Sequence, residues 1–580
     1  VIGTWLITKS LLLFHTALCI DKNVGFWKDP SMTFRSPIFE LSHTYIDDAA
    51  ALSPMDCTYL GNGLNQDKLD DFSIAGAAKS ADLTKATLAK LVALKPIDEI
   101  DRIAQTVMKE RLESGLALYE SQESFVLWNV LTSPPSNVRS IFELMPKATD
   151  QDFDNIGKRL AAVDGAYKSW TGAIMQVAKS GKTTAQRQVR GVIEQLESYA
   201  NGGFSAMCKN FDADGKHPAM HAKAKLAEKA AAETASFLKN EYLPIATPND
   251  AVGADRYAVW ARYFTGAKLD LRATYEWGMA DLKAINARMW EIAELIKPGA
   301  KTLREVADHL DHDPKYVIKG AENVVKYLQD FTDAAMVRMD GEYFDIDDRI
   351  KICEARLAPE GSASAPYYNP PSEDLSRPGT TWIPMLGKDE VSSWHLVSTW
   401  YHEAVPGHHL QCATVAIEKD RLSRFQINAA WISGYGEGWA LYAERFMNEL
   451  GAFDEPGIEM GYLSAQALRA ARIVVDIGMH LGYTDFDGNV WNAESSRKLL
   501  NEQALLDEDH SRSETDRYLG WPGQAISYKV GERVWMKARE DAKARLGAEF
   551  SLKKFHTYAL KIGPMGLDPF AAELANWDGK

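Results

Sequence analysis

The chain lacks the cysteine patterns on which many small domains and metal sites depend. Its five cysteines are widely separated and none forms a C-x-x-C pair; they stand at Cys19, Cys57, Cys208, Cys353 and Cys412. This spacing excludes a cysteine-based zinc site and provides no disulfide framework. One or two disulfides stay possible, and the sequence does not indicate how they would pair.

An excess of basic residues is also absent. The chain has 65 Lys and Arg against 80 Asp and Glu, which gives a formal net charge of -15 at pH 7. Because nucleic acid requires a basic protein face, we expect no nucleic-acid partner. The overall charge says little about a small substrate, since a cleft can carry a local charge opposite to that of the whole protein.

Long apolar runs are scarce. Beyond the N-terminus no segment approaches 18 uninterrupted apolar residues, so we expect no integral membrane span. The stretch from Leu11 to Cys19 resembles the apolar core of a signal peptide, with Ala17 and Cys19 placed for cleavage after Cys19. That interpretation predicts a signal segment at residues 1–19 and a secreted or periplasmic protein. The alternative is a buried N-terminal strand or helix.

Helical periodicity dominates the remaining sequence. Apolar residues recur at three- and four-residue spacing in long segments rich in Ala, Leu, Lys and Glu, which are good helix formers. These segments are residues 81–94, 100–115, 152–179, 183–200, 221–243 and 269–296. The pattern predicts a mainly helical protein.

One region interrupts the helical pattern. Residues 343–382 contain five prolines between short apolar runs, which predicts loops and a few strands in a small sheet. Helical periodicity resumes near Val391. Since no Pro/Ser-rich linker or internal repeat is present, we expect one merged helical body. Within it we place an N-terminal helical part at residues 30–340 and a catalytic part at residues 341–580.

Histidines cluster soon after this region. Four of the 13 histidines of the chain fall within fifteen residues, at His395, His402, His408 and His409. Zinc peptidases commonly carry H-E-x-x-H on a helix, because this spacing puts both imidazoles on one face and the glutamate beside the metal-bound water. Here His402 is followed by Glu403, but the next histidine comes six residues after His402. In a regular helix six residues rotate about 600° and rise about 9 Å, so these two side chains could not share a metal.

Two residues between the histidines offer a solution. Pro406 cannot donate a hydrogen bond to the carbonyl of His402, and Gly407 tolerates unusual backbone angles. A helical bulge at this point would absorb the extra residues and bring His408 back beneath His402. His409 is then directed elsewhere. The competing assignment makes His409 the second ligand in place of His408.

A third protein ligand is expected because catalytic zinc usually takes three, leaving the fourth position for water. Glu437 is the best candidate, since three glycines surround it and a helix of good formers follows, ending near Gly451. Glu444 lies seven residues later on the same helix face. It either orients a ligand histidine or forms an ordinary surface ion pair.

At these residues the chain resembles a bacterial zincin-like family, the domain-of-unknown-function family 885. The resemblance rests on His-Glu-Ala-Val-Pro-Gly-His-His-Leu-Gln, which begins at His402, and on Glu-Gly-Trp-Ala-Leu-Tyr-Ala-Glu, which begins at Glu437. Further similar blocks begin at Tyr367, Arg472 and Pro522, and a helical block covers residues 257–278. The resemblance covers most of residues 40–575.

The chain is more distantly similar to helical metallopeptidases such as thimet oligopeptidase and angiotensin-converting enzyme. This resemblance implies a mainly α-helical zincin-like metallopeptidase fold, with a deep cleft and a small β-sheet beside the metal site. It also implies an exopeptidase or oligopeptidase that accepts short peptides or small acyl-amino compounds. Members of the bacterial family are frequently exported, in agreement with the interpretation of the N-terminus.

The expected chemistry uses one Zn²⁺ per chain, held by His402, His408 and Glu437. Glu403, adjacent to a ligand, is expected to act as the general base for the attacking water. The oxyanion needs a donor besides the metal. His480 and Tyr528 are our candidates from the two downstream blocks, with Tyr518 as the alternative tyrosine.

Substrate contacts are predicted from the same blocks. Arg472 and Lys529 are candidates for binding a substrate carboxylate, against a role as ordinary surface charges. The segment that begins at Tyr367 could form an edge strand that pairs with an extended peptide. A metal-dependent amidase or esterase acting on a non-peptide substrate, or a non-catalytic binding protein with a relic site, are the alternative functions.

Overall fold

Short polar side chains open most of the helices in the first half of the chain. In the computed structural model, which describes residues 33–359, 365–372 and 374–580, Ser36, Asp98 and Thr149 each accept a hydrogen bond from the backbone N–H three residues later. Such caps satisfy N–H groups that have no partner within the helix. The signal segment expected at residues 1–19 lies outside the described residues.

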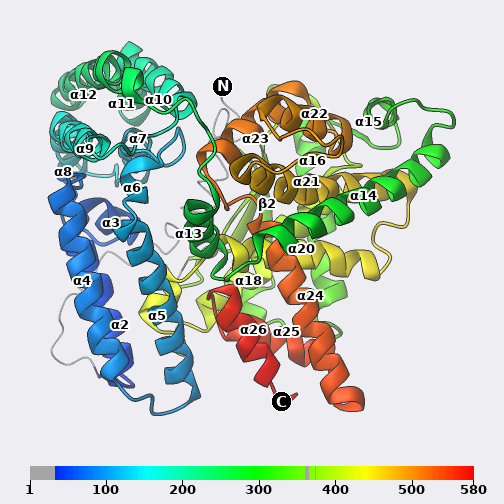
Figure 1. Ribbon diagram of the computed structural model, residues 1–580. Coiled ribbons are helices and arrows are strands. Elements are labelled where there is room, and N and C mark those ends of the chain that lie inside the picture. Colours follow the sequence, from blue (N-terminus) through cyan, green and yellow to red (C-terminus); the bar gives the residue numbers. More distant parts are fainter. Residues whose placement is uncertain (1–32, 360–364, 373) are drawn as a thin grey trace. The chain divides into compact units, whose positions relative to one another are not determined.

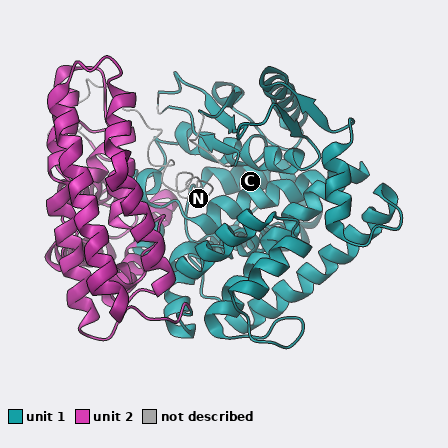
Figure 2. Cartoon of the chain, turned by 90° about the horizontal axis from the view of Figure 1, so that it is seen from above, with its two compact units in different colours: residues 1–17, 106–111, 251–580 teal, residues 18–105, 112–250 magenta. Residues whose placement is uncertain are grey.

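The chain forms two compact units, which Figure 2 shows in different colours. Of the described residues, unit 1 contains 106–111 and 251–580, and unit 2 contains 33–105 and 112–250. The sequence predicts one merged body with a boundary at residue 340, whereas here the main division falls at residue 250. Helical periodicity runs through both regions and does not indicate which helices pack together, so it could not locate this division.

Unit 2 is entirely helical in its described part. Its core is built from aromatic and branched side chains, with Trp128 packed edge-on against Trp170 at 5.1 Å between ring centroids. The α-helices are α2 (Pro37–Leu52), α3 (Pro54–Tyr59), α4 (Ile74–Ala93), α5 (Glu99–Glu120, whose middle belongs to unit 1), α6 (Glu123–Val126), α7 (Pro134–Leu144), α8 (Asp150–Ala161), α9 (Val163–Ala178), α10 (Gln186–Ser198), α11 (Phe204–Phe211) and α12 (Pro218–Phe237).

Unit 1 combines helices with short strands. Its helices are α13 (Ala254–Thr265), α14 (Leu271–Ile296), α15 (Leu303–His312), α16 (Ala321–Met339), α17 (Leu396–Glu403), α18 (His408–Ile417), α19 (Arg424–Ala429), α20 (Ser433–Glu449), α21 (Pro456–Leu481), α22 (Ala493–Gln503), α23 (Glu508–Gly520), α24 (Ser527–Leu546), α25 (Leu552–Lys561) and α26 (Leu567–Asn576). Its strands are β1 (Val317–Lys319), β2 (Cys353–Leu357), β3 (Tyr367–Asn369), β4 (Gly379–Ile383) and β5 (Glu390–Ser392).

The strands form two small sheets. β1 pairs with β5 in an antiparallel ladder, and a three-stranded sheet has the order β2-β4-β3, with β2 parallel and β3 antiparallel to β4. Residues of α16, the three-stranded sheet and α17 share one apolar cluster that includes Leu328, Ile383 and Trp400. The prediction of a mainly helical protein with small sheets is therefore confirmed. The deep cleft implied by the resemblance stays a prediction.

Two long helix pairs form the centre of unit 1. α14 lies along α21, and α20 lies along α24, as Figure 1 shows. The second pair approaches so closely that a Cβ atom on Gly438 would stand 2.5 Å from the Cα atom of Gly531. Glycine at these two positions lets the backbones of α20 and α24 come into direct contact.

Two further expectations concern membranes and disulfides. Among the described residues, no helix combines the length and apolarity that crossing a membrane requires. Cys57, Cys208, Cys353 and Cys412 are buried free thiols, so no disulfide joins any two of them. The disulfides left open by the sequence are absent among these four cysteines, and Cys19 lies outside the described residues.

Candidate metal centre

The two histidines of the motif lie on separate helices. α17 ends at Glu403 and α18 begins at His408, with residues 404–407 between them. The sequence predicts a bulge within one continuous helix, and the structure corrects this to a complete break followed by a new helix. In the turn the N–H of Gly407 donates to the carbonyl oxygen of Tyr401 and the N–H of His409 to that of Ala404, each at 3.1 Å, before the second helix continues.

The turn between the helices requires glycine. A Cβ atom on Gly407 would stand 1.9 Å from the carbonyl oxygen of His402 and 2.4 Å from that of Tyr401. The turn is also tied to α20, since the indole N–H of Trp439 donates to the carbonyl oxygens of Pro406 and Gly407 at 3.0 and 2.9 Å. The segment that separates the histidines is thereby fixed to the helix that carries Glu437.

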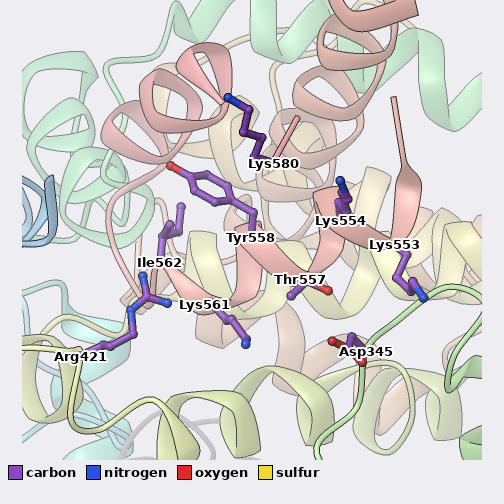
Figure 3. Close-up of a pocket in the computed structure, with 9 residues that line it drawn as sticks. All are labelled: Asp345, Arg421, Lys553, Lys554, Thr557, Tyr558, Lys561, Ile562 and Lys580. Atoms are coloured by element: carbon purple, nitrogen blue, oxygen red, sulfur yellow. The ribbon is translucent and has the colours of Figure 1, made fainter. Parts of the chain in front are cut away.

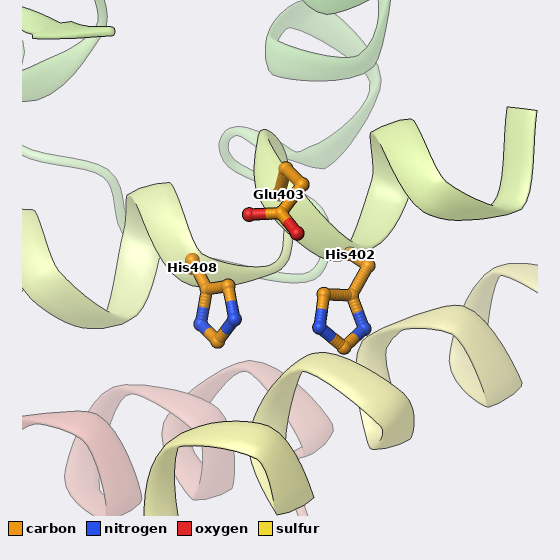
Figure 4. A group of neighbouring side chains, drawn as sticks. All are labelled: His402, Glu403 and His408. Atoms are coloured by element: carbon orange, nitrogen blue, oxygen red, sulfur yellow. The ribbon is translucent and has the colours of Figure 1, made fainter. Parts of the chain in front are cut away.

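Figure 4 shows the result, with His402 and His408 on neighbouring helices and their rings side by side. The ring centroids are 4.8 Å apart and the rings are nearly perpendicular, at 88°. One donor atom from each of His402, Glu403 and His408 lies within 4.8 Å of the others. His402 and His408 are buried and Glu403 is half-buried. A helix break has thus brought together the side chains that a regular helix would have separated.

Glu437 completes the donor set from the opposite side. Its Oε2 atom lies 3.2 Å from Nε2 of His402 and 3.6 Å from Nε2 of His408. Ligands at about 2.0–2.2 Å from a tetrahedral zinc ion stand about 3.3–3.5 Å from one another. The two distances from Glu437 to the histidines are therefore compatible with a single zinc ion, and two imidazoles with one carboxylate are a donor set that zinc accepts.

Glu444 fixes the orientation of His402. Its Oε1 atom accepts a hydrogen bond from Nδ1 of His402 at 2.7 Å, and its other oxygen accepts one from the hydroxyl of Ser398. With Nδ1 engaged by Glu444, Nε2 is the nitrogen that faces Glu437 and is available to a metal ion in place of a proton. Glu444 is fully buried, so the structure places it behind a ligand histidine rather than in a surface ion pair.

The electrostatics of this cluster favour a cation. Burial lowers the pKa of His402, but hydrogen bonds to Glu437 and Glu444 more than offset this and raise it to about 9. Burial raises the pKa of Glu437, yet the two histidines hold it well below its usual range. Two ionised carboxylates around two imidazoles make a buried site that is stabilised by positive charge, carried by a proton or by a metal ion.

His409 has no place in this cluster. Its Nε2–H donates to the carbonyl oxygen of Ile350 at 2.7 Å, and its Nδ1 lies 3.0 Å from the hydroxyl of Tyr368 on β3. Burial lowers the pKa of His409 to about 4, so the ring is neutral. One nitrogen ties α18 to the short 3-10 helix Asp348–Ile350 and the other ties it to β3, so the geometry favours His408 as the second candidate ligand.

Tyr528 lies beside the candidate metal ligand His402. Its ring is stacked over His402 with 6.4 Å between centroids and 20° between planes. Burial raises the pKa of Tyr528 well above its usual range, so the hydroxyl keeps its proton and can donate it in a hydrogen bond. The position of this tyrosine on α24 follows from the close contact between α20 and α24.

The structure gives His480 a different role from the one predicted. Its Nδ1 accepts a hydrogen bond from the backbone N–H of Val252 at 3.3 Å, and its Nε2 donates to the carbonyl oxygen of Tyr518 at 3.0 Å. Burial lowers the pKa of His480 to about 4. Because backbone groups engage both nitrogens, His480 has no donor left for an oxyanion. Tyr518, the alternative donor, directs its hydroxyl to Glu514 instead.

The predicted cationic contacts are also engaged within the protein. Lys529 is buried and donates to Gln466 and Glu532, each at 2.7 Å. Its ammonium group therefore holds the fold together and is not directed to a substrate. Arg472 stacks on the ring of Tyr528 and is paired with Glu514 at 2.8 Å.

The edge strand is present but short. Tyr367 begins β3, an outer strand of the three-stranded sheet, and its ring stacks on Trp382 at 6.1 Å. The neighbouring Tyr368 contacts His409, which directly follows the ligand His408. The edge of the sheet consequently lies near α18, as a strand that binds an extended peptide would require.

The sequence did not lead us to two residues near the candidate metal centre. Ser398 supports Glu444, and its position four residues before His402 on the same helix face could have indicated this contact. Arg469, one turn before Arg472, has its guanidinium carbon 5.9 Å from the ring centroid of Tyr528. Nothing in the local sequence distinguishes Arg469 from a surface arginine.

A cavity elsewhere in unit 1 contains none of the predicted site residues. It measures about 360 Å³ and its lining carries five cationic side chains and one acidic one, which Figure 3 shows. Several of the cations already have partners, such as Glu418 for Arg421 and Lys561. We therefore assign no function to this cavity.

Comparison with known protein families identifies the family of this chain. Residues 54–574 match the family described as "Bacterial protein of unknown function (DUF885)". The chain belongs to this family. Because the DUF885 description assigns no function, membership confirms the predicted family and leaves the metallopeptidase assignment to be tested. Comparison with the curated proteins finds no significant match.

Two solved structures have a similar fold. One is the crystal structure of a protein from Colwellia psychrerythraea provisionally classed as a lipoprotein, with a TM-score of 0.80 and 21% identity; the similarity covers 94% of this chain and 99% of that one. The other, a protein of unknown function from Shewanella oneidensis with the same provisional class, has a TM-score of 0.75 and 19% identity, covering 93% and 100%. At these identities the likeness concerns the fold alone.

Proposed function

We propose that this member of DUF885 is a zinc-dependent hydrolase that cleaves peptide bonds in short peptides. The observation that supports the proposal most strongly is the donor set, in which one oxygen of Glu437 lies 3.2 and 3.6 Å from the Nε2 atoms of His402 and His408. These three residues would hold one zinc ion per chain. Its ligand number leaves a position for water.

The chain's own residues have distinct roles in this proposal. When bound, zinc lowers the pKa of a water molecule and polarises the carbonyl group of the substrate. Glu403 is close to the ligands and half-buried, so its carboxylate takes the proton of the attacking water and delivers it to the leaving amine. The hydroxyl of Tyr528 donates a hydrogen bond to the oxyanion.

Short peptides are the proposed substrates because the family resembles helical oligopeptidases, whose clefts exclude folded proteins. The likeness to two proteins provisionally classed as lipoproteins, together with the apolar N-terminal stretch, supports a location outside the cytoplasm. Export would place the enzyme where peptides are taken up or degraded.

The decisive experiment compares the wild-type chain with Glu403→Gln on a mixture of short peptides read by mass spectrometry. The substitution keeps the shape of the side chain and removes the base. We expect zinc to be retained and the rate to fall by at least about 10²–10⁴-fold. Glu322→Gln, an exposed glutamate on α16, is the matched control and should behave like the wild type.

The outcomes separate the alternatives. Wild-type protein that binds no zinc would overturn the proposal. Bound zinc with cleavage of amide or ester compounds, and none of peptides, would favour a hydrolase of non-peptide substrates. Near-normal activity in Glu403→Gln would show that another residue activates the water.

A further inference from the structure

Two arginines of α21 border the face of Tyr528 next to the metal ligands. The guanidinium carbons of Arg472 and Arg469 lie 4.5 and 5.9 Å from the centroid of this ring. The same ring stands 6.4 Å from the ring of His402. The two cations and the ring of His402 therefore all lie within 6.4 Å of the centre of one aromatic ring.

Two of the arginines at this place share one carboxylate. Arg472 donates to Glu514 at 2.8 and 3.2 Å, and Arg517 donates to the same carboxylate at 2.8 and 3.1 Å. One half-buried glutamate thus compensates two guanidinium groups. Arg469 adds a third positive charge to the group.

Arg469 differs from Arg472 in having no acidic partner among the residues that the structure describes. Its only hydrogen bond there is a long one, 3.4 Å from Nη1 to the carbonyl oxygen of Ala465. The Nε atom of Arg469 and the Nη1 atom of Arg472 are both buried without an acceptor in the described chain. Buried donors of this kind are costly to leave without an acceptor, so the site favours a ligand that accepts hydrogen bonds.

We propose that Arg469, supported by Arg472, binds the C-terminal carboxylate of the substrate, so that the enzyme removes residues from the carboxyl end of peptides. The inference rests on the proposed function and adds its substrate class. A planar guanidinium group binds a carboxylate through two parallel hydrogen bonds, which suits the unused donors of this pair.

The spacing fits cleavage near the end of a chain. An extended peptide covers about 3.3–3.6 Å per residue. His402, Tyr528 and Arg469 follow one another at 6.4 and 5.9 Å, so a carboxylate held by Arg469 lies at most a few residues from the bond that the metal centre attacks. The expected products are short C-terminal fragments.

Three peptides test the proposal: N-acetylated pentaalanine with a free carboxylate, the same peptide as its C-terminal amide, and an amide in which the last alanine is replaced by glutamate. For the wild-type holoenzyme we expect kcat/KM to be about 10–100-fold higher for the free acid than for either amide. In Arg469→Gln the ratio should fall towards one, and in Arg469→Lys it should be intermediate. Arg512→Gln, an exposed arginine on α23, should keep the wild-type ratio.

Each outcome decides between alternatives. Equal rates on the free acid and the plain amide in the wild type, or an unchanged ratio in Arg469→Gln, would overturn the inference. A glutamate amide cleaved as fast as the free acid would show a site for side-chain carboxylates, which also overturns cleavage at the carboxyl end. If Arg469→Gln loses its zinc or does not fold, the test relies on Arg469→Lys instead. A ratio of free-acid to amide kcat/KM as high as that of the wild type in Arg469→Lys would then count against the proposal.

Failure of the proposed function can be distinguished from failure of this inference. If the wild type cleaves none of the peptides, calorimetric binding of the free acid and the plain amide to zinc-loaded Glu403→Gln still measures the preference. Tighter binding of the free acid that is lost in the double variant Glu403→Gln, Arg469→Gln would support the carboxylate site alone. Equal binding of the two peptides would overturn it.

Discussion

Two buried histidines of unit 1 lie near carboxylates and nevertheless prefer opposite charge states. The pKa of His402 is raised to about 9, and that of His480 is lowered to about 4. Both side chains are almost completely buried, with 3% and 1% exposure. Burial alone therefore does not determine which histidine attracts a cation.

The difference lies in the groups that face the ring nitrogens. His402 has an ionised carboxylate at each nitrogen, Glu444 at 2.7 Å and Glu437 at 3.2 Å. His480 has backbone groups at both, and its nearest carboxylate, Asp476, is 3.6 Å away. Burial raises the pKa of Asp476 to about 7, so this group also tends to be neutral. A histidine among ionised carboxylates is suited to bind a metal, whereas one among backbone dipoles supports the fold.

The largest effect is expected from removing Glu437, one of the two carboxylates that face His402. Glu437→Ala removes an expected ligand and leaves two imidazoles, so zinc and all zinc-dependent hydrolysis should be lost. Metal analysis after dialysis measures this directly. His480→Ala is the control, and the folded fraction of that variant should keep its zinc. Full zinc occupancy in Glu437→Ala would contradict the ligand assignment.

The next effect separates the two oxyanion donors that the sequence suggested together. Tyr528→Phe should lower kcat by about 10²–10³-fold with little change in KM or zinc content, because the hydroxyl acts mainly in the transition state. His480→Ala should lower the melting temperature and leave kcat of the folded protein unchanged. A rise in KM alone for Tyr528→Phe would instead indicate a substrate-positioning role.

A smaller effect is expected from changing Glu444, which accepts a hydrogen bond from the candidate ligand His402. Glu444→Gln keeps a hydrogen bond to Nδ1 of His402 and removes the negative charge, so zinc affinity should fall by about 10–100-fold. Competition with a chelator measures the dissociation constant. Ser398→Ala, which weakens the same contact indirectly, should have a lesser effect. Unchanged affinity in Glu444→Gln would mean that its charge does not tune the ligand.

The smallest effect concerns Asp476, the carboxylate near His480. The folded-state pKa of Asp476 is about 7 against an ordinary value of 3.8, so the folded state binds more protons between these values. Stability should therefore fall as pH rises from about 4 to about 7. Asp476→Asn still accepts from Tyr257 and the N–H of Gly523, and it should remove this slope. Melting temperatures of the wild type and of Asp476→Asn across pH 4–8 test this prediction. At pH 8 the two melting temperatures should differ by about one to a few degrees. Melting temperatures that depend on pH in the same way in both proteins would contradict it.

That His402, His408 and Glu437 come together could be predicted from sequence, because the spacing of the two histidines conflicts with a regular helix. The step of six residues from His402 to His408 requires a break, and Pro406 with Gly407 provides one. Glu437 was recognisable from its glycine-rich surroundings at a helix start. In each case a local rule of backbone geometry points to the side chain.

The rest depends on contacts between distant segments. His480 is engaged by Val252 and Tyr518, which are 228 and 38 residues away in sequence, and no local pattern indicates these bonds. Arg469 is distinguished by having no acidic partner among the described residues, which the local sequence does not indicate. The division at residue 250 follows from which helices pack together, and helical periodicity carries no information about partners.

The contact between Gly438 and Gly531 limits how the site can move. Glu437 and Glu444 are on α20, Tyr528 is on α24, and the two backbones touch without any side chain between them. Because glycine has no side chain, no change of rotamer at this contact can let the two helices slide past each other. α20 and α24 should therefore behave as one rigid body in a catalytic cycle, and any closure around a peptide must come from the segments that face them, such as the strands beside α18.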